Sequence, residues 1–435
     1  MKIGILGGGL TGLSLGYFLK EKRIDFEILE KEEECGGLCR SHQEQGFTFD
    51  CSGGHILWSG NKEILNFMLS LISDNIRENK RNTKIFYKNK FIKYPFENGL
   101  ADLDPEERFE CLFHFIDSIY KKDKKEPENF EDWVYYAFGK AIAEKYMIPY
   151  NKKIWKSDLK ELGLDWIRIK DRLPQPKLEN VLKSALGINS EGYAEQILFY
   201  YPKKGGIQSV IKSLENKIDG DVTCNFEIKK LIKNENKWIV SNGTIKKEFD
   251  EIISTVPIID LINLIDDVPK HIKEASKNLK YNSFISVVLG LNVENLNNFH
   301  WLYIPDIEVK THKIIFPKNN TPEVSPKGKS LLVAEIICKF NDDFWSLSDE
   351  EIIKEIVEQL DKNKIIEKSI VCFSKVMRTR YAYVVNDLNY QKNLSLIKDF
   401  LSKQGIKLCG RFGEWRYMNM DACIEAAKKL SDDYK

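Results

Sequence analysis

The stretch KIGILGGGLTGLSLGYFLKEKRIDFEILEK, residues 2–31, decides the fold. Its first apolar residues predict a short β-strand, its glycine-rich centre predicts a tight turn, and the apolar pattern from Leu13 to Leu19 predicts a helix. A second apolar run, residues 26–29, predicts another strand that ends at Glu30. Strand, glycine turn, helix and strand in this order are typical of a dinucleotide-binding α/β domain.

Each glycine of the turn has a chemical reason. Gly7 permits the tight turn, Gly9 lets a pyrophosphate approach the backbone, and Gly12 lets the helix pack against the strand. The helix then presents unpaired N–H groups and the positive end of its dipole to the phosphates. Glu30 lies 18 residues after Gly12 and is placed to bind a ribose. The glycine pattern alone also fits an ordinary turn, but the flanking strand, helix and acid favour a dinucleotide site.

The next segment, ECGGLCRSHQEQGFTFDCSGGHILW (residues 34–58), favours FAD over NAD. A glycine pair closely follows the ribose acid, Arg40 comes three residues after it, and a further glycine pair precedes His55. An NAD domain normally continues into a helix here, whereas large flavoproteins pass such a loop along the second half of FAD. The alternative is an ordinary surface loop.

Composition describes a soluble globular protein. The 435 residues suffice for two or three domains, and the net charge of +1 gives no argument for nucleic acid or an anionic membrane as partner. The nine cysteines lack metal-ligand spacing, so we expect reduced thiols and no metal site. No apolar run approaches the roughly 18 residues of a membrane span, and the N-terminus lacks a secretory signal. We therefore expect a cytoplasmic protein.

Periodicity outlines the rest of the chain. Residues 61–190 read as mainly helical, broken by KFIKYPFENGL, and a helix should end at Pro149. Tyr150 and Trp155 follow that proline and are predicted to form a stacking wall for a base or sugar. Residues 199–257 alternate as an antiparallel meander that returns to a buried strand, and residues 284–380 are β-rich with one helix.

Taken together, the two chain ends give a resemblance to the glutathione-reductase-like flavoproteins and, within them, to the UDP-galactopyranose mutases. Amine oxidases and protoporphyrinogen oxidases share the first and last segments but usually lack the PYNKKIW type of segment. The motifs that carry the resemblance are GGLCRS, FDCSGGHILW, KYPFENGL, MIPYNKKIW, YPKKGGIQ, ISTVP, FPKNNTP and GRFGEWRYMNMDACIEAA.

The resemblance implies an α/β fold. A Rossmann-type FAD-binding domain would be assembled from residues 1–75, 200–265 and 381–435, with a mainly helical subdomain at 76–199 and an antiparallel β-sheet substrate domain at 266–380. Strand 406–409 would be the last strand of the FAD domain. The helix that begins near Asp421 would point its N-terminus at the flavin, an interaction of about 0.3–2 kcal/mol that favours the anionic reduced form.

The implied activity is the interconversion of pyranose and furanose forms of a nucleotide sugar, UDP-galactose or a related one. In the mutases, N5 of reduced FAD attacks the sugar, displaces UDP, and the adduct recloses as the other ring. The resemblance further implies a role in cell-surface polysaccharide biosynthesis, allows NAD(P)H or another compound as the reductant, and allows a homodimer.

Site residues follow from the same resemblance. The implied catalytic residues are His55, Arg172, Lys313 and Arg411. The implied substrate-binding residues are Tyr150, Trp155, Arg172, Tyr201, Lys313, Tyr383, Tyr417 and Asn419. The implied cofactor-binding residues are Gly7, Gly9, Leu10, Thr11, Gly12, Glu30, Lys31, Gly37, Leu38, Arg40, Gly54, His55, Phe226, Val256, Gly410, Arg411 and Met420.

Several of these assignments have plainer alternatives. Arg172 would equally cap a helix, Tyr383 would equally face a core, and His55 would equally be a satisfied core histidine. Lys313 stands where mutases typically carry arginine, and Asn419 stands where many carry aspartate, so the nucleotide sugar stays open. The residues 187–196 and 201–206 are candidate lid segments by their glycine and polar content.

Two other functional classes compete with the mutase. A flavin oxidase of the amine or protoporphyrinogen type would need an apolar, uncharged cavity instead of converging Arg, Lys and Tyr side chains. A catalytically idle FAD-binding protein is the third interpretation, and Arg411, His55 and Tyr417 argue against it.

Overall fold

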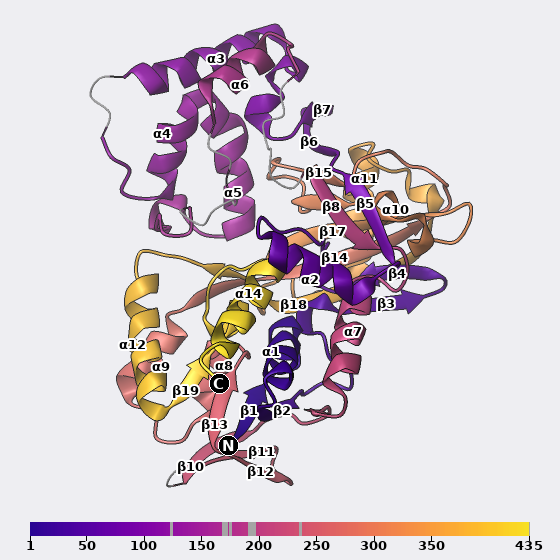
Figure 1. Ribbon diagram of the computed structural model, residues 1–435. Coiled ribbons are helices and arrows are strands. Elements are labelled where there is room, and N and C mark those ends of the chain that lie inside the picture. The colour runs from indigo at the N-terminus through magenta and orange to yellow at the C-terminus, as the bar shows by residue number, and fades with distance from the viewer. Residues whose placement is uncertain (122–124, 168–172, 174–175, 190–196, 235–236, 435) are drawn as a thin grey trace.

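A five-stranded parallel sheet forms the centre of the lower half of the molecule (Figure 1). The computed structural model describes residues 1–121, 125–167, 173, 176–189, 197–234 and 237–434. Three distant segments build this sheet, because the strand order is β19-β13-β1-β2-β9. The strands are β1 (Lys2–Leu6), β2 (Asp25–Leu29), β9 (Val222–Thr223), β13 (Glu251–Ser254) and β19 (Ile406–Leu408). The doubly wound domain predicted from residues 2–31 is thereby confirmed.

The apolar residues of β1 explain its central position. Ile5 is fully buried and lies opposite Ile28 of β2 and Ile253 of β13. Strands buried on both faces require apolar side chains throughout. Apolar side chains of four helices form the core on one face, and those of three others form a core on the opposite face. The first group is α1 (Leu10–Glu21), α2 (Lys62–Ile72), α7 (Gln208–Ile218) and α14 (Met420–Ser431); the second is α8 (Ile258–Leu264), α9 (Lys270–Lys277) and α12 (Tyr390–Gln404).

A three-stranded antiparallel meander precedes the buried strand β13, as the alternating pattern predicted, but residues 208–218 within the predicted range 199–257 form helix α7 instead. Its strands are β10 (Lys230–Asn234), β11 (Lys237–Ser241) and β12 (Lys246–Phe249).

A seven-stranded sheet of order β18-β14-β17-β16-β15-β6-β7 forms the second layer. The helix expected near residues 349–361 is α11 (Asp349–Lys362), which begins with a capping box at Ser348. The strands are β6 (Thr83–Tyr87), β7 (Lys90–Lys93), β14 (Lys280–Leu291), β15 (Trp301–Tyr303), β16 (Lys313–Ile315), β17 (Ser330–Cys338) and β18 (Val371–Val385).

The helical prediction for residues 61–190 is wrong between residues 76 and 87, which form β5 (Ile76–Lys80) and β6. The predicted break at KFIKYPFENGL begins with β7. β6 and β7 extend the seven-stranded sheet, while β5 pairs with β8 (Leu198–Pro202). Alternation within these strands buries Ile85 and Ile92 on the core side, and partner strands elsewhere in the chain satisfy the backbone.

The prediction that a helix ends at Pro149 is also wrong. A π-helical turn (Ala143–Met147) runs directly into α5 (Ile148–Trp155), and Pro149 lies in the first turn of α5. A proline is tolerated in that turn because its missing N–H has no helical partner there. The helical unit at the top of Figure 1 consists of α3 (Pro105–Tyr120), α4 (Phe130–Ile142), α5 and α6 (Leu178–Ala185).

Two further observations concern membrane-spanning helices and cysteines. Within the described part of the chain, no helix has the length and apolar character to cross a bilayer. All nine cysteines are free thiols.

Candidate functional site

The glycine turn between β1 and α1 is fixed by contacts within the protein and is open at one point. A Cβ on Gly12 would lie 2.0 Å from the carbonyl oxygen of Gly7, and Gly7 itself has a φ of +100°. By contrast, a Cβ on Gly9 would meet no atom nearer than the Cα of Gly37, at 3.9 Å. The protein itself therefore requires glycine at position 12. At position 9 a side chain would meet no close protein atom, so the glycine leaves free space above the backbone.

The second glycine loop lies directly against the first. Gly36 has a φ of +128° and donates its N–H to the carbonyl oxygen of Gly8 at 2.9 Å. Gly37 is exposed and continues into the 3₁₀ turn Gly37–Cys39, which includes Leu38. The two loops together form a surface of bare backbone.

The acid at the end of β2 is held by backbone donors. Glu30 accepts the N–H of Gly8 through Oε2 at 2.7 Å and the N–H of Glu32 through Oε1 at 3.0 Å. The backbone N–H of Phe226 donates to the carbonyl oxygen of Glu30 at 2.8 Å, so Phe226 belongs to this site through its backbone. Lys31, in contrast, is exposed, and its Nζ lies 3.4 Å from a carboxylate oxygen of Glu32.

Two buried polar groups beside these loops lack a partner among the described residues. They are the hydroxyl of Ser14 in α1 and Nε of Arg40. A buried donor without a partner is costly. The open backbone at Gly9, the fixed Glu30 and these unpartnered donors fit the pyrophosphate and ribose of a dinucleotide such as FAD.

The last segment of the chain packs onto this cradle. A Cβ on Gly410 would lie 2.3 Å from Oγ1 of Thr11, and a Cβ on Gly413 would lie 2.5 Å from the carbonyl oxygen of Ser254. The short helix α13 (Gly410–Gly413) therefore lies on the start of α1 and the end of β13. Val256 also borders the cradle, because a Cβ on Gly7 would lie 3.2 Å from its Cγ1. Both chain ends thus build one site, as the sequence predicted.

Helix α14 begins where the sequence predicted a helix near Asp421. Its first residue is Met420, and the exposed Asn419 is its N-cap residue. Asp421 accepts a hydrogen bond from the hydroxyl of Ser59 at 2.9 Å.

Arg411 joins the cradle to two tyrosines. Its Nη1 donates to the carbonyl oxygen of Met418 at 3.1 Å, and its Nη2 donates to that of Ala382. The guanidinium carbon lies 4.7 Å from the ring centre of Tyr417 and 5.4 Å from that of Tyr383. Since Nε is buried without a partner among the described residues, Arg411 keeps one donor for a ligand.

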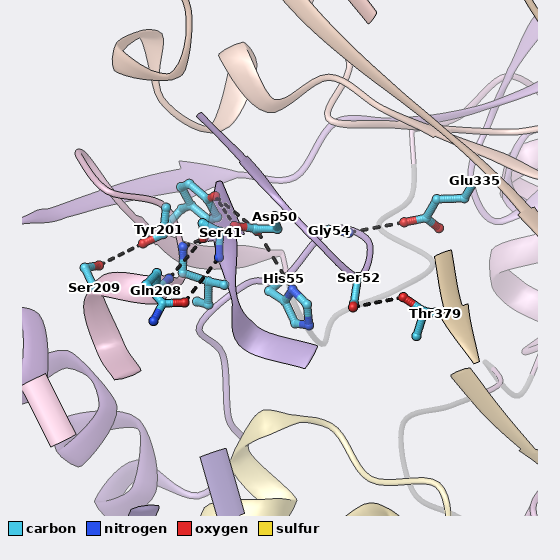
Figure 2. A network of polar contacts seen from close by, with 12 residues as sticks. Ser41, Asp50, Ser52, Gly54, His55, Tyr201, Gln208, Ser209, Glu335 and Thr379 are labelled. Atoms are coloured by element: carbon cyan, nitrogen blue, oxygen red, sulfur yellow. Dashed lines mark hydrogen bonds and ion pairs between the residues drawn. The ribbon is translucent and has the colours of Figure 1, made fainter. Parts of the chain in front are cut away.

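His55 lies on the loop after β4 (Phe47–Asp50), beside a network of polar contacts (Figure 2). Its Nδ1 is 3.8 Å from Oδ2 of Asp50, and that nitrogen is buried without a hydrogen bond among the described residues. The exposed Gly54 donates its N–H to Oε1 of Glu335 at 3.2 Å. The imidazole is therefore not a satisfied core histidine.

Tyr201 does not lie where its predicted role requires. Its side chain is 2% exposed, and its hydroxyl donates to Asp50 at 3.1 Å (Figure 2). Strand β8 places it in the core between the sheets, because pairing with β5 fixes the direction of its side chain. The predicted role of Tyr201 as a substrate contact is therefore wrong.

A cavity of about 240 Å³ lies between the helical unit and the seven-stranded sheet. Five residues predicted to bind substrate line it: Tyr150, Trp155, Lys313, Tyr383 and Tyr417. Arg172 lies outside the described residues. The cavity has further polar and aromatic lining residues that the sequence did not predict, which include Tyr94, Glu97, Tyr146, Trp166, Tyr303 and His312. Two of them, Tyr94 and Glu97, lie in the motif KYPFENGL.

The charge of Lys313 is stabilised within this cavity. Its Nζ lies 3.3 Å from Oε2 of the buried Glu335. Burial alone would lower the pKa of Lys313, but the Glu335 carboxylate outweighs it and raises that pKa. Burial lowers the pKa of the adjacent His312 well below its ordinary value, so this imidazole is neutral.

Tyrosines line the same cavity as Lys313. The rings of Tyr383 and Tyr417 stack with centres 6.2 Å apart, and those of Tyr146 and Tyr150 stack at 5.4 Å. Burial, and after it the Glu335 charge, raises the pKa of Tyr383 to about 12. The cavity therefore offers neutral phenol donors and one cation, a set suited to an oxyanion.

The fold and the glycine cradle define a dinucleotide-binding flavoprotein of the α/β class. Residues 10–428 match the family described as flavin containing amine oxidoreductase, and the chain belongs to this family of FAD-dependent enzymes.

Relatives in this family differ in activity. A coproporphyrinogen III oxidase of Staphylococcus aureus is 20% identical, over 77% of this chain and 78% of the relative. A polyamine oxidase of rice is 22% identical, over 82% and 71% of the two chains, and a UDP-galactopyranose mutase of Mycoplasma pneumoniae is 21% identical, over 56% and 59%.

Solved structures share the fold over nearly the whole chain. A reduced UDP-galactopyranose mutase superposes with a TM-score of 0.91 at 22% identity, covering 99% of this chain and 94% of the other. A putative protoporphyrinogen oxidase from Exiguobacterium sp. 255-15 gives a TM-score of 0.77 at 16% identity, with coverage of 99% and 98%. At these identities the structures establish the fold.

Proposed function

We propose that the protein is a UDP-galactopyranose mutase-like isomerase that interconverts the pyranose and furanose forms of a nucleotide sugar. The observation that carries the proposal is the convergence of Lys313, Tyr383 and Tyr417 on one cavity, with Arg411 stacked behind the two phenols. A cation and neutral phenols together recognise a diphosphate without the need for a metal ion.

Reduced FAD would supply the nucleophile that this chemistry needs. The residues of the chain bind and orient the sugar nucleotide. Lys313 holds a positive charge against the leaving diphosphate, and Tyr383 and Tyr417 donate hydrogen bonds to it. Arg411 uses two nitrogens to hold the bend at Met418 and strand β18 together, which fixes the two tyrosines. Tyr150 and Trp155 offer aromatic faces to the uridine.

His55 is assigned to the flavin side of the site. Its unpartnered Nδ1, half-buried side chain and glycine neighbours support a contact with cofactor or sugar. Lys313 in place of arginine and Asn419 in place of aspartate leave the identity of the sugar open. NAD(P)H as reductant, a cytoplasmic location and a homodimer belong to the same proposal.

An oxidase of the amine or protoporphyrinogen type is the second candidate. It is favoured by the coproporphyrinogen and polyamine oxidases among the relatives and by a carboxyl group, Glu97, in the aromatic cavity. A carboxylate among aromatic rings would suit an ammonium substrate. The oxidase would require the flavin to be reduced by its substrate.

One experiment separates the two. The FAD-loaded protein is reduced with dithionite without oxygen, UDP-galactopyranose is added, and the products are separated by chromatography. The mutase yields a furanose product only when the flavin is reduced. The oxidase instead bleaches the oxidised flavin with an amine or a porphyrinogen and forms peroxide in air. Turnover of another nucleotide sugar, with none of UDP-galactose, would assign specificity to Lys313 and Asn419.

A further inference from the structure

The cavity contains a carboxyl group that the proposed reaction leaves unexplained. Glu97 lies in the short 3₁₀ turn Phe96–Asn98, and its side chain is only 2% exposed. It is the single acidic residue among the described residues that line the cavity. Within the described part of the chain no basic side chain contributes to the pKa of Glu97. Burial without a basic partner favours the neutral form of the acid, which still needs a hydrogen-bonding partner, and a ligand in the cavity would supply one.

Neutral aromatic rings surround this carboxyl group. Phe96 stacks on Tyr146 with ring centres 5.1 Å apart, and Tyr146 stacks in turn on Tyr150. Burial raises the pKa of Tyr146 and of Tyr150 well above the ordinary value, so both phenols stay neutral. Tyr94 and Tyr303 pack against each other on the strand side of the cavity, with ring centres 4.9 Å apart.

The nearby charged and titratable groups are engaged elsewhere or neutral. The guanidinium of Arg81 lies over the ring of Tyr94, 5.0 Å from its centre. Lys313 is paired with Glu335, and His312 is neutral. Burial raises the pKa of Glu97 to about 7, and no neighbouring charge adds to this effect. Among the described residues that line the cavity, Glu97 is therefore the one whose charge changes near neutral pH.

We infer that Glu97 determines which class of ligand the cavity accepts, and that as a neutral acid it hydrogen-bonds a hydroxyl group of an anionic nucleotide sugar. This inference rests on the proposed function for its choice of ligand. An ionised Glu97 would repel the diphosphate, since like charges repel strongly when buried. An ammonium ligand would reverse the preference, because it would pair with the ionised form.

The sign of the pH dependence follows. Protonated Glu97 predominates below about pH 7, so binding of UDP-galactose is tightest there and weakens as the pH rises. If binding requires the protonated form, the Kd rises about tenfold between about pH 6 and about pH 8. Glutamine is neutral at every pH and can still donate a hydrogen bond, so Glu97→Gln should bind with a Kd that varies little over this range.

Isothermal titration calorimetry of the FAD-loaded protein with UDP-galactose tests this without measuring turnover. Wild type, Glu97→Gln and a matched control, Glu107→Gln, are compared across the pH range. Glu107 is a half-buried acid of α3 outside the cavity lining, with its carboxylate 2.8 Å from Lys88 and 3.3 Å from Lys145. Burial would raise the pKa of Glu107, but the hydrogen bonds from Lys88, Tyr87 and Lys145 lower it. The control should therefore keep the pH dependence of wild type.

The possible results are separable. Equal pH dependence in wild type and Glu97→Gln overturns the inference and leaves the proposed function standing. Absence of UDP-galactose binding at every pH excludes UDP-galactose as the ligand, and absence of turnover of every nucleotide sugar tested removes the proposed function. Spermidine is then titrated as an ammonium ligand. If spermidine binds more tightly as the pH rises, and Glu97→Gln loses that binding, Glu97 still determines the ligand class, but its ionised form selects a cation. If neither ligand binds, the inference fails as well.

Discussion

The cofactor cradle and the aromatic cavity are built from different parts of the polypeptide. The cradle is formed by backbone, at Gly7, Gly9 and Gly12 and at the facing Gly36 and Gly37. The cavity is formed by side chains from α5, β16, β18 and the bend after α13. A backbone site needs residues without side chains at a fixed local spacing. A side-chain site needs particular groups brought together from anywhere in the chain.

Two glycine substitutions give the largest expected effect on flavin binding and separate protein geometry from ligand geometry. Gly12→Ala places a Cβ against the carbonyl oxygen of Gly7, so the apo-protein should lose about 1–3 kcal/mol of stability together with its flavin. Gly9→Ala would meet only the Cα of Gly37, at an ordinary contact distance of 3.9 Å. It should unfold in urea like wild type as apo-protein and yet purify without the flavin absorbance.

Gly60→Ala is the control for this pair, because its Cβ would meet only Trp58 at 3.8 Å. Normal flavin content in Gly9→Ala would contradict the cradle that we describe.

Breaking the buried pair in the cavity should have the largest effect on folding stability. Lys313→Met leaves the Glu335 carboxylate buried without its ammonium partner, so the free energy of unfolding should fall by about 3–5 kcal/mol. The double variant Lys313→Met with Glu335→Gln removes both charges and should recover most of this loss. Urea unfolding curves of the single and double variants measure it. Equal loss in both would show that the pair is not the cause.

Substitution of Lys153 tests whether its hydrogen bonds hold helix α5 against the loop between β15 and β16. Its Nζ, buried on α5, donates to the carbonyl oxygens of Ile304, Asp306 and Thr311 at 2.7–2.8 Å. These bonds tie the helix of Tyr150 to the loop between β15 and β16. Lys153→Met should cost about 2–3 kcal/mol because buried carbonyl groups lose their donor.

The neighbouring Lys152 is exposed and provides the control, since Lys152→Met should leave stability unchanged. Thermal denaturation of the two variants side by side is the measurement. A similar Tm in both would argue against the tie.

The smallest effect is expected at Lys31, which was predicted to bind the cofactor. It is exposed, and its ion pair with Glu32 is open to solvent. Lys31→Ala should therefore change the free energy of FAD binding by less than about 1 kcal/mol. Fluorescence titration of apo-protein with FAD measures this. A much larger loss would mean that side chains, and not only backbone, define the cradle.

The errors of sequence analysis share one physical origin. Residues 76–87 are predicted as helical because nothing local shows that β5 pairs with β8 and β6 with β15, each more than a hundred residues away. Tyr201 belongs to the motif YPKKGGIQ, which carries part of the family resemblance. Pairing of β8 with β5 nevertheless directs its side chain to Asp50 and away from a substrate. Glu97 lay in a motif that the sequence analysis quoted, but nothing local marks it as buried beside Tyr146.

The sequence by itself determined the cofactor site, because a glycine turn, a helix start and a terminal acid depend on neighbours within about 30 residues of chain. It also indicated that the last segment belongs with the first. Only the tertiary structure decided which tyrosines share a cavity, that Lys313 is paired with Glu335 and that Glu97 has no basic partner among the described residues. Those facts depend on desolvation and on long-range strand pairing, which no local pattern of residues contains.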